Sequence, residues 1–267
     1  MYDEFYGFSE PPFHITPNPR FLYFSRQHQE AFDHLVFGVR ERKGFIQLTG
    51  EVGAGKTTLC RAFLEHLGSS YETALVLNPR LTPTQLMRSI LVELGLEPHR
   101  TRDACLADLN EFLLDRVTRG RDVVLLIDEA QDMDRELLEE VRLLSNLETD
   151  DRKLLQIVLI GQPELRDLLA DDALRQLRQR ILVRYHLDPL SADETESYIR
   201  YRLGVAGANS RPTFGSGALR AIHRYSGGIP RLINAVCDKT LLCGYVVGVD
   251  HLTRSHVRRA VRELEGG

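Results

Sequence analysis

Short apolar runs alternate with helix-like patterns between residues 45 and 187. Each run is nearly unbroken, which is typical of a parallel strand that is buried on both faces. The segments between the runs place apolar residues three or four positions apart, as on one face of a helix. Strands that alternate with helices in this way predict a doubly wound parallel sheet. The expected strands are residues 45–49, 73–78, 123–127, 154–161 and 181–187.

The strand signal stops after Pro189, and only helical patterns follow it. Ser191 and Glu194 have the spacing of a capping box, in which two side chains satisfy backbone N–H groups at the start of a helix. We therefore expect an α/β domain at residues 25–188 and an α-helical lid domain at residues 189–267. Further helices of the lid are expected at residues 216–225, 229–244 and 253–264.

Composition sets limits on the class of protein. The formal net charge of −4 gives no global field that would hold nucleic acid, so such a contact would need a local patch. No stretch of about 18 uncharged apolar residues occurs, and the acidic start of the chain is unlike a signal peptide, so we expect no membrane span in this chain. The histidines show no metal-ligand spacing. A reducing cytoplasm is expected because no C-x-x-C pair occurs among Cys60, Cys105, Cys237 and Cys243.

A glycine-rich segment after the first expected strand matches G-x-x-x-x-G-K-[ST], a phosphate-binding loop. Its glycines let backbone N–H groups surround phosphate oxygens, and the helix that follows adds its positive dipole end. Lys56 is expected to reach the β and γ phosphates, and the Thr57 hydroxyl to bind Mg²⁺. ATP or ADP with Mg²⁺ is thus the expected ligand. Its binding residues are Gly50, Glu51, Val52, Gly53, Ala54, Gly55, Lys56, Thr57 and Thr58.

Two carboxylates follow the apolar run at residues 123–127. The carboxyl ends of parallel strands meet at one edge of the sheet, where the phosphate loop also begins. Asp128 is suited to hold hydrated Mg²⁺, since magnesium keeps several of its waters. Glu129 is suited to polarise the attacking water as a general base. This pair makes hydrolysis plausible in addition to binding.

The N-terminal residues 1–24 are rich in aromatic residues and proline, as in FYGFSEPPFHITPNPRFLYF. Because proline blocks helix formation, we expect an extended arm whose rings dock on a surface. Two roles remain open for the arm, which are packing on the domain and forming part of an adenine pocket.

Taken together, these motifs make the chain resemble an AAA+ ATPase. Within that superfamily it resembles component A of the general secretion pathway and its relatives in exosortase and pilus-biogenesis systems. The segments that carry the resemblance span nearly the whole chain, and they are the N-terminal arm, ERKGFIQLTGEVGAGKTT, LLIDEAQ, LIGQPELR and SGGIPRLIN. The resemblance implies a P-loop αβα sandwich with a five-stranded parallel sheet and a C-terminal α-helical lid.

Three further site residues are implied by the resemblance. Gln162 matches the polar sensor, and Arg231 matches the lid arginine that touches the γ phosphate. The arginine finger that enters a neighbouring subunit is placed in LRQLRQRILV, where Arg180 is favoured and Arg178 is second. A finger acting in trans implies a homo-oligomer, either a ring or a helical filament.

The favoured function is a cytoplasmic ATPase that remodels or positions a secretion or envelope-assembly system. Secretion-pathway relatives continue into a transmembrane helix and a periplasmic domain, so peripheral placement at the inner membrane, through a partner or a missing C-terminal region, is the alternative location. One rival function is a DNA-binding AAA+ regulator, which the negative charge disfavours. The other is a nucleotide-gated scaffold with little turnover.

Four arginines near the end of the chain share much of one helical face. This face is either solvated or binds nucleic acid or an acidic partner. The four are Arg254, Arg258, Arg259 and Arg262.

Overall fold

The computed structural model describes residues 2–16, 18–149, 152–208 and 211–266. Contacts divide the chain into two compact units. The sheet unit comprises residues 30–50 and 60–187, and the helical unit comprises residues 1–29, 51–59 and 188–267.

The sheet unit contains five parallel strands in the order β2-β3-β4-β1-β5. The five-stranded parallel sheet expected from the apolar runs is thus confirmed. The strands are β1 (Phe45–Gly50), β2 (Tyr71–Val76), β3 (Asp122–Ile127), β4 (Leu155–Gly161) and β5 (Ile181–Leu187).

Strand β2 lies two residues earlier than the apolar run indicates. It is Tyr71–Val76 rather than 73–78, and Tyr71 pairs with Asp122 at the start of β3. The strand ends at Val76, whose carbonyl accepts a hydrogen bond from the N–H of Asp128 at 2.9 Å. Pro79 follows closely, and a proline restricts the backbone of the residue before it and supplies no N–H to a strand. The run therefore includes two residues that have already left the sheet.

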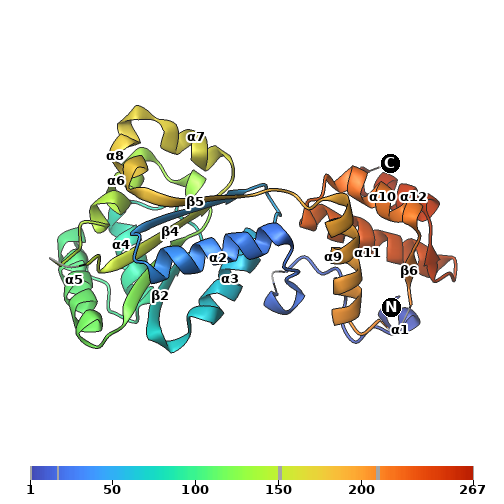
Figure 1. Cartoon of the computed structure of the whole chain (residues 1–267), viewed down its shortest axis with the longest axis horizontal. Helices are drawn as coiled ribbons and strands as arrows, with labels where there is room; N and C mark the ends of the chain where they lie inside the picture. The colour runs from blue at the N-terminus through green and yellow to red at the C-terminus, as the bar shows by residue number, and fades with distance from the viewer. Residues whose placement is uncertain (1, 17, 150–151, 209–210, 267) are drawn as a thin grey trace. The chain divides into compact units, whose positions relative to one another are not determined.

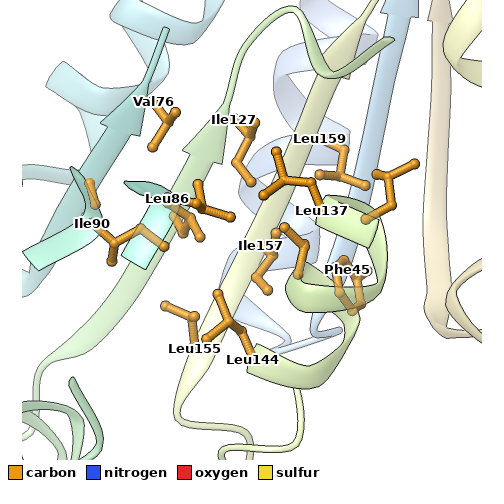
Figure 2. Close-up of a cluster of buried hydrophobic side chains, with 14 of the residues drawn as sticks. Phe45, Val76, Leu86, Ile90, Ile127, Leu137, Leu144, Leu155, Ile157 and Leu159 are labelled. Carbon is orange, nitrogen blue, oxygen red and sulfur yellow. The ribbon is translucent and has the colours of Figure 1, made fainter. Parts of the chain in front are cut away.

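Helices cover both faces of the sheet and make three layers. On one face, the long helices bury apolar side chains against alternate strand residues such as Ile127, Ile157 and Leu159 (Figure 2). On the other face, Gly38 of the helix Arg26–Arg40 lies close to Ile46 of β1. A Cβ at position 38 would come within 2.5 Å of the Ile46 side chain. The helices of this unit are α4 (Pro83–Glu93), α5 (Arg102–Thr118), α6 (Arg135–Leu144), α7 (Glu164–Ala170) and α8 (Arg175–Arg180), with most of α2 (Arg26–Arg40) and α3 (Lys56–Leu67) on the opposite face.

The helical unit has its own apolar core. Its helices are α1 (Tyr2–Tyr6), α9 (Ala192–Val205), α10 (Ser216–Ser226), α11 (Pro230–Val246) and α12 (Arg254–Leu264). Helices α9 to α12 are drawn in orange to red in Figure 1. The expected capping box at the start of α9 is present, with Ser191 and Glu194 bonding each other's backbone N–H. Two short strands, β6 (Thr213–Phe214) and β7 (His251–Leu252), pair within this unit and were not expected from the sequence.

The N-terminal arm packs on the helical unit. Phe8, Phe13 and Phe21 are buried in its core, and the Arg202 guanidinium lies 4.8 Å from the centre of the Phe21 ring. The packing interpretation of the arm is therefore confirmed for these rings. Its first part is helical rather than extended, because α1 precedes the first proline of the chain and ends before Gly7, which has a φ of 77°.

Candidate nucleotide-binding site

The phosphate loop lies between β1 and α3. Gly53 and Gly55 have φ values of 80° and 102°, which a residue with a Cβ rarely adopts. Helix α3 begins at Lys56, so Lys56, Thr57 and Thr58 occupy its first turn, where the N–H groups have no partner within the helix. This turn carries the positive end of the helix dipole. The local geometry is thus that of an anion-binding loop at a helix N-terminus.

Three carbonyl groups of the loop accept hydrogen bonds. The carbonyl of Glu51 accepts from Lys56 Nζ at 3.0 Å, and that of Gly53 accepts from the N–H of Arg231 at 3.2 Å. The third, on Ala54, lies 3.1 Å from Nε2 of His28. In a planar trans peptide the C=O and the following N–H point in opposite directions. Fixing these carbonyls therefore fixes the directions of the next N–H groups. The loop motif predicts that such groups bind phosphate, although the N–H of Ala54 is bonded to the carbonyl of Glu51 at 3.1 Å.

Arg231, the expected lid sensor, lies against the loop. It is the second residue of α11, after Pro230, and its N–H is one of those that the helix leaves unsatisfied. A Cβ on Gly53 would come within 2.5 Å of the Cβ of Arg231. The close approach therefore requires glycine at position 53, and the loop carbonyl caps α11 in place of a side chain.

His28 is a residue of this site that the sequence reasoning missed, since it was interpreted as structural only. Its ring is buried, with Nδ1 lying 2.7 Å from Oγ of Ser25 and Nε2 facing Ala54. A carbonyl can only accept, so Nε2 carries the proton and Nδ1 accepts from the serine hydroxyl. The available signal was the Ser-x-x-His spacing at the start of α2, where Ser25 also accepts from the N–H of His28 at 3.3 Å.

The pKa of His28 is lowered from its usual 6.5, because burial disfavours the charged ring more than the hydrogen bond to Ala54 favours it. Below pH 6.5 the unfolded chain binds a proton at this position more readily than the folded chain does, so stability should fall as the pH drops through this range. We expect the urea midpoint of the wild type to fall more between pH 7.5 and pH 5.5 than that of His28→Gln. His34→Gln is the matched control, because His34 is exposed on the same helix and should behave as wild type. Parallel curves for the wild type and His28→Gln would contradict the prediction.

Asp128 and Glu129 follow β3 at the carboxyl edge of the sheet. Asp128 is buried, and its Oδ1 accepts the N–H of Glu129 at 2.9 Å. Glu129 has a left-handed backbone with a φ of 53°, which is uncommon for a residue other than glycine and is found most often at functional sites. The turn sets the two carboxylates in different environments, one buried and one partly exposed.

Glu129 is held by two glutamines. Its Oε2 accepts from Nε2 of Gln131 at 2.8 Å and from Nε2 of Gln162 at 3.1 Å. Gln131 also accepts the N–H of Gln162 through its Oε1 at 2.9 Å. The sequence reasoning named Gln162 but did not assign Gln131, although it stands in the DEAQ segment. A Cβ on Gly161 would lie 2.8 Å from Oε1 of Gln131, so this network also depends on a glycine at the end of β4.

The strand order places these groups along one edge of the sheet unit. Strand β4 lies between β3 and β1, so Gln162 at the end of β4 stands between the carboxylate pair and Gly50 at the end of β1. The phosphate loop continues directly from Gly50. Ligands of open parallel sheets bind outside this edge.

The arginines that precede β5 are bonded within the chain. Nη1 of Arg180 contacts Oγ of Ser145 and the carbonyl of Arg142 at the C-terminus of α6. Nη1 of Arg178 donates to the carbonyl of Ala170 at 2.6 Å, at the end of α7. Each guanidinium thus interacts with the negative end of a helix in its own chain.

The residues fit a hydrated magnesium ion. The Thr57 hydroxyl and the Asp128 carboxylate would offer oxygen atoms, which Mg²⁺ prefers, and one or two protein oxygens are the usual number because the ion keeps its waters. Among the described residues, no group of three or more histidine, cysteine, aspartate or glutamate side chains is placed to hold a metal. A metal site made only of these four side-chain types is therefore not found in the described part of the chain.

Comparison with known proteins agrees with the fold. Residues 39–169 match the AAA domain family. The chain therefore contains an AAA-family domain. It is also a homologue of general secretion pathway protein A of Aeromonas hydrophila, with 48% identity over 270 residues. The match covers 100% of this chain and 49% of that protein, so the chain spans about half the length of this relative. The resemblance inferred from the motifs is thus confirmed.

Solved structures share the fold at low sequence identity. A Drosophila origin recognition complex bound to DNA matches with a TM-score of 0.72 and 21% identity, over 95% of this chain and 64% of that chain. The ORC2 protein of Aeropyrum pernix, in ADPNP and ADP complexes, matches with a TM-score of 0.70 and 18% identity, over 96% and 72%. The RuvB branch-migration motor of Thermotoga maritima has a TM-score of 0.60 and 20% identity, over 90% and 69%. These likenesses establish a P-loop AAA fold.

None of the helices in the described ranges is both long enough and apolar enough to span a membrane.

Proposed function

We propose that this protein is a Mg²⁺-dependent ATPase that assembles from several copies and acts on a secretion or envelope-assembly system. The observation that carries the proposal is the phosphate loop, whose carbonyls are held by Lys56, Arg231 and His28. A loop with fixed peptide directions needs little reorganisation when it binds a triphosphate, and such preorganisation favours both affinity and catalysis.

Binding is assigned to the loop and the start of α3. The N–H groups of residues 51–58 donate to phosphate oxygens, and Lys56 exchanges its bond to Glu51 for the β and γ phosphates. The Thr57 hydroxyl and the Asp128 carboxylate would hold hydrated Mg²⁺. When bound, Mg²⁺ supplies charge neutralisation for the phosphates. The proposal includes the expected domain boundaries after residues 24 and 188. Arg231, in the lid domain, is assigned to contact the γ phosphate and to respond to its loss.

Hydrolysis is assigned to Glu129 and the glutamines that hold it. The Glu129 carboxylate orients the attacking water and accepts its proton as the bond between the γ phosphorus and the bridging oxygen breaks, giving ADP and phosphate. Gln162 and Gln131 position the carboxylate through the hydrogen bonds of 3.1 and 2.8 Å. Gln162 also serves as the sensor, because a change at the γ phosphate would alter its bond to Glu129.

Assembly from several copies follows from the arginine finger. Arg180 is the proposed finger, and entry into a neighbouring site would exchange its bonds to Ser145 and Arg142 for phosphate oxygens. A finger is worth about 10³ to 10⁵ in turnover. Head-to-tail contacts of this kind close into rings or continue as helical filaments.

Mixing two inactive variants tests the finger and the assembly together. Lys56→Ala retains Arg180 but should not bind ATP, whereas Arg180→Lys should bind ATP but lacks the guanidinium. We expect each alone to lose at least about 10²-fold in ATP turnover. In the mixture, about a quarter of head-to-tail interfaces join an intact site to an intact arginine, so a comparable fraction of wild-type turnover should return.

Arg178→Lys is the matched control for this experiment, because Arg178 also caps a helix in its own chain. It should retain turnover by itself. If Arg178→Lys instead lost turnover by itself and regained it on mixing with Lys56→Ala, the finger would be Arg178. Absence of recovery in either mixture would overturn the proposal of a finger in trans.

The cellular setting is proposed from the homologue. General secretion pathway protein A is named for a secretion pathway, and this chain matches about half of it. Secretion or envelope-assembly proteins are accordingly the proposed partners, in the cytoplasm or at the inner membrane. DNA-stimulated turnover in the purified protein would instead support the DNA-binding regulator.

A further inference from the structure

Helices α10 and α12 form a groove on the helical unit. Its volume is about 650 Å³, which is large enough for several side chains of a ligand. Four arginines line it, and we call it the arginine groove. They are Arg224 of α10 and Arg254, Arg258 and Arg262 of α12.

Among the residues that the structure describes, none supplies a carboxylate that pairs with an arginine of the groove. Of the residues in α10 and α12, Glu263 alone carries a carboxylate, and Arg259 holds it at 3.2 Å on another side of the helix. Across the described ranges of the chain, no carboxylate forms an ion pair with any of the four groove arginines, although ion pairs are common elsewhere on this surface. Nε of Arg262 donates to the carbonyl of Arg258 at 3.4 Å, which leaves its charge without a carboxylate partner. Four guanidinium groups of this kind around one groove are suited to an anionic ligand.

The groove also has an apolar floor. Val257 is buried, and Val261 and Tyr225 are partly buried beneath the arginines. A ligand that offers only negative charge, such as a phosphate backbone, would leave this floor without apolar contacts. An amphipathic ligand, acidic on its edges and apolar in its centre, satisfies both parts of the groove.

The spacing of the arginines favours a helix as the ligand. Arg254, Arg258 and Arg262 are four residues apart, so their Cα atoms follow one another at about 6 Å along α12. Glutamates four residues apart on a partner helix repeat at the same distance. An extended strand would bring unpaired backbone N–H and C=O groups against helices whose own groups are already bonded.

We propose that the arginine groove binds an acidic amphipathic helix of a partner protein. The glutamates of that helix pair with the arginines, and its apolar side chains pack on Tyr225, Val257 and Val261. Nothing in this inference depends on ATP hydrolysis, because all of the residues involved lie in α10 and α12.

A synthetic peptide provides the test with the full chain. The probe is a helical peptide of about 18 residues, long enough to be helical in water, with glutamate at every fourth position and leucine beside it. A scrambled peptide of the same composition is the reference. By fluorescence anisotropy we expect the ordered peptide to bind, and Arg254→Glu/Arg258→Glu to weaken its binding by at least about tenfold.

Arg220→Glu/Arg259→Glu is the control, because it makes the same change in net charge on the two helices that form the groove, at residues that do not line it. It should weaken binding by less than about threefold. Thermal melts check that both variants fold, and Arg254→Gln/Arg258→Gln provides a milder form. Equal binding of the scrambled peptide, equal loss in both double variants, or no binding at millimolar peptide would overturn the proposal. Tighter, steeply salt-dependent binding of duplex DNA that requires Arg254 and Arg258 would overturn it in favour of nucleic acid.

Discussion

Replacing Lys56 with alanine is expected to weaken ATP binding by at least about 10²-fold and to reduce turnover below detection. Lys56 is buried in the phosphate loop, with its ammonium group directed at a loop carbonyl 3.0 Å away. Removing one partner of a buried, hydrogen-bonded charge pair costs about 2–5 kcal/mol, which corresponds to this loss of affinity. Isothermal titration with ATP measures the binding, and phosphate release measures the turnover.

Lys43→Ala is the matched control for this change. Lys43 lies just before β1, and its ammonium group stacks 5.3 Å from the centre of the Phe37 ring. An exposed contact of this kind contributes about 0.5–1 kcal/mol to stability, and its loss should leave ATP affinity unchanged. If Lys56→Ala binds ATP as the wild type does, the loop is not the phosphate site and the proposed function fails.

Replacing Glu129 with glutamine is expected to reduce turnover by about 10²- to 10⁴-fold, the range that a general base contributes. ATP affinity should change by less than about threefold, since binding is assigned to the loop and not to Glu129. The amide cannot accept a proton from water. Its N–H₂ group is a donor, so it cannot accept the hydrogen bonds that Gln131 and Gln162 donate to the carboxylate. Single-turnover phosphate release, compared with equilibrium binding, separates the two effects.

Glu136→Gln is the corresponding control, because Glu136 is exposed in the first turn of the nearby helix α6. It should hydrolyse ATP as the wild type does. If the wild type and Glu129→Gln hydrolyse ATP equally slowly, the protein is better described as a nucleotide-gated scaffold, and the assignment of Glu129 as a base is wrong.

The hydrogen bond from Arg231 to Gly53 suggests how nucleotide could influence the helical unit. The first-turn N–H of α11 is satisfied by the loop itself, and Ile229, at the N-cap position, supplies no side-chain bond. Any change in the direction of the Gly53 peptide therefore removes a cap from a 17-residue helix. Loss of a cap costs about 1 kcal/mol, which is enough to change the populations of two arrangements severalfold.

Much of the fold could be predicted from local patterns. The apolar runs identified all five strands, and the side chain of Ser191 correctly indicated where α9 begins. These signals are local, since a strand buried on both faces must be apolar and a helix start needs a capping side chain. The phosphate loop was equally local, because its glycines and lysine stand at fixed spacing in one segment.

Tertiary structure decided the features whose partners are distant in the sequence. His28 meets Ala54, and Gln131 meets Gln162, across separations that no periodic pattern records. The two-residue strands β6 and β7 were missed because two residues are too few to show a period. The helix at residues 2–6 was missed because the prolines further along the arm outweighed a short segment that contains none.

The sequence by itself determined the class of protein, since phosphate binding needs glycine, lysine and a hydroxyl at fixed spacing within one loop. Only the folded chain decided which side chains hold that loop and that carboxylate, and which arginines share a groove. Such contacts depend on the distance between segments in space, and the spacing of residues along the chain carries no direct record of that distance.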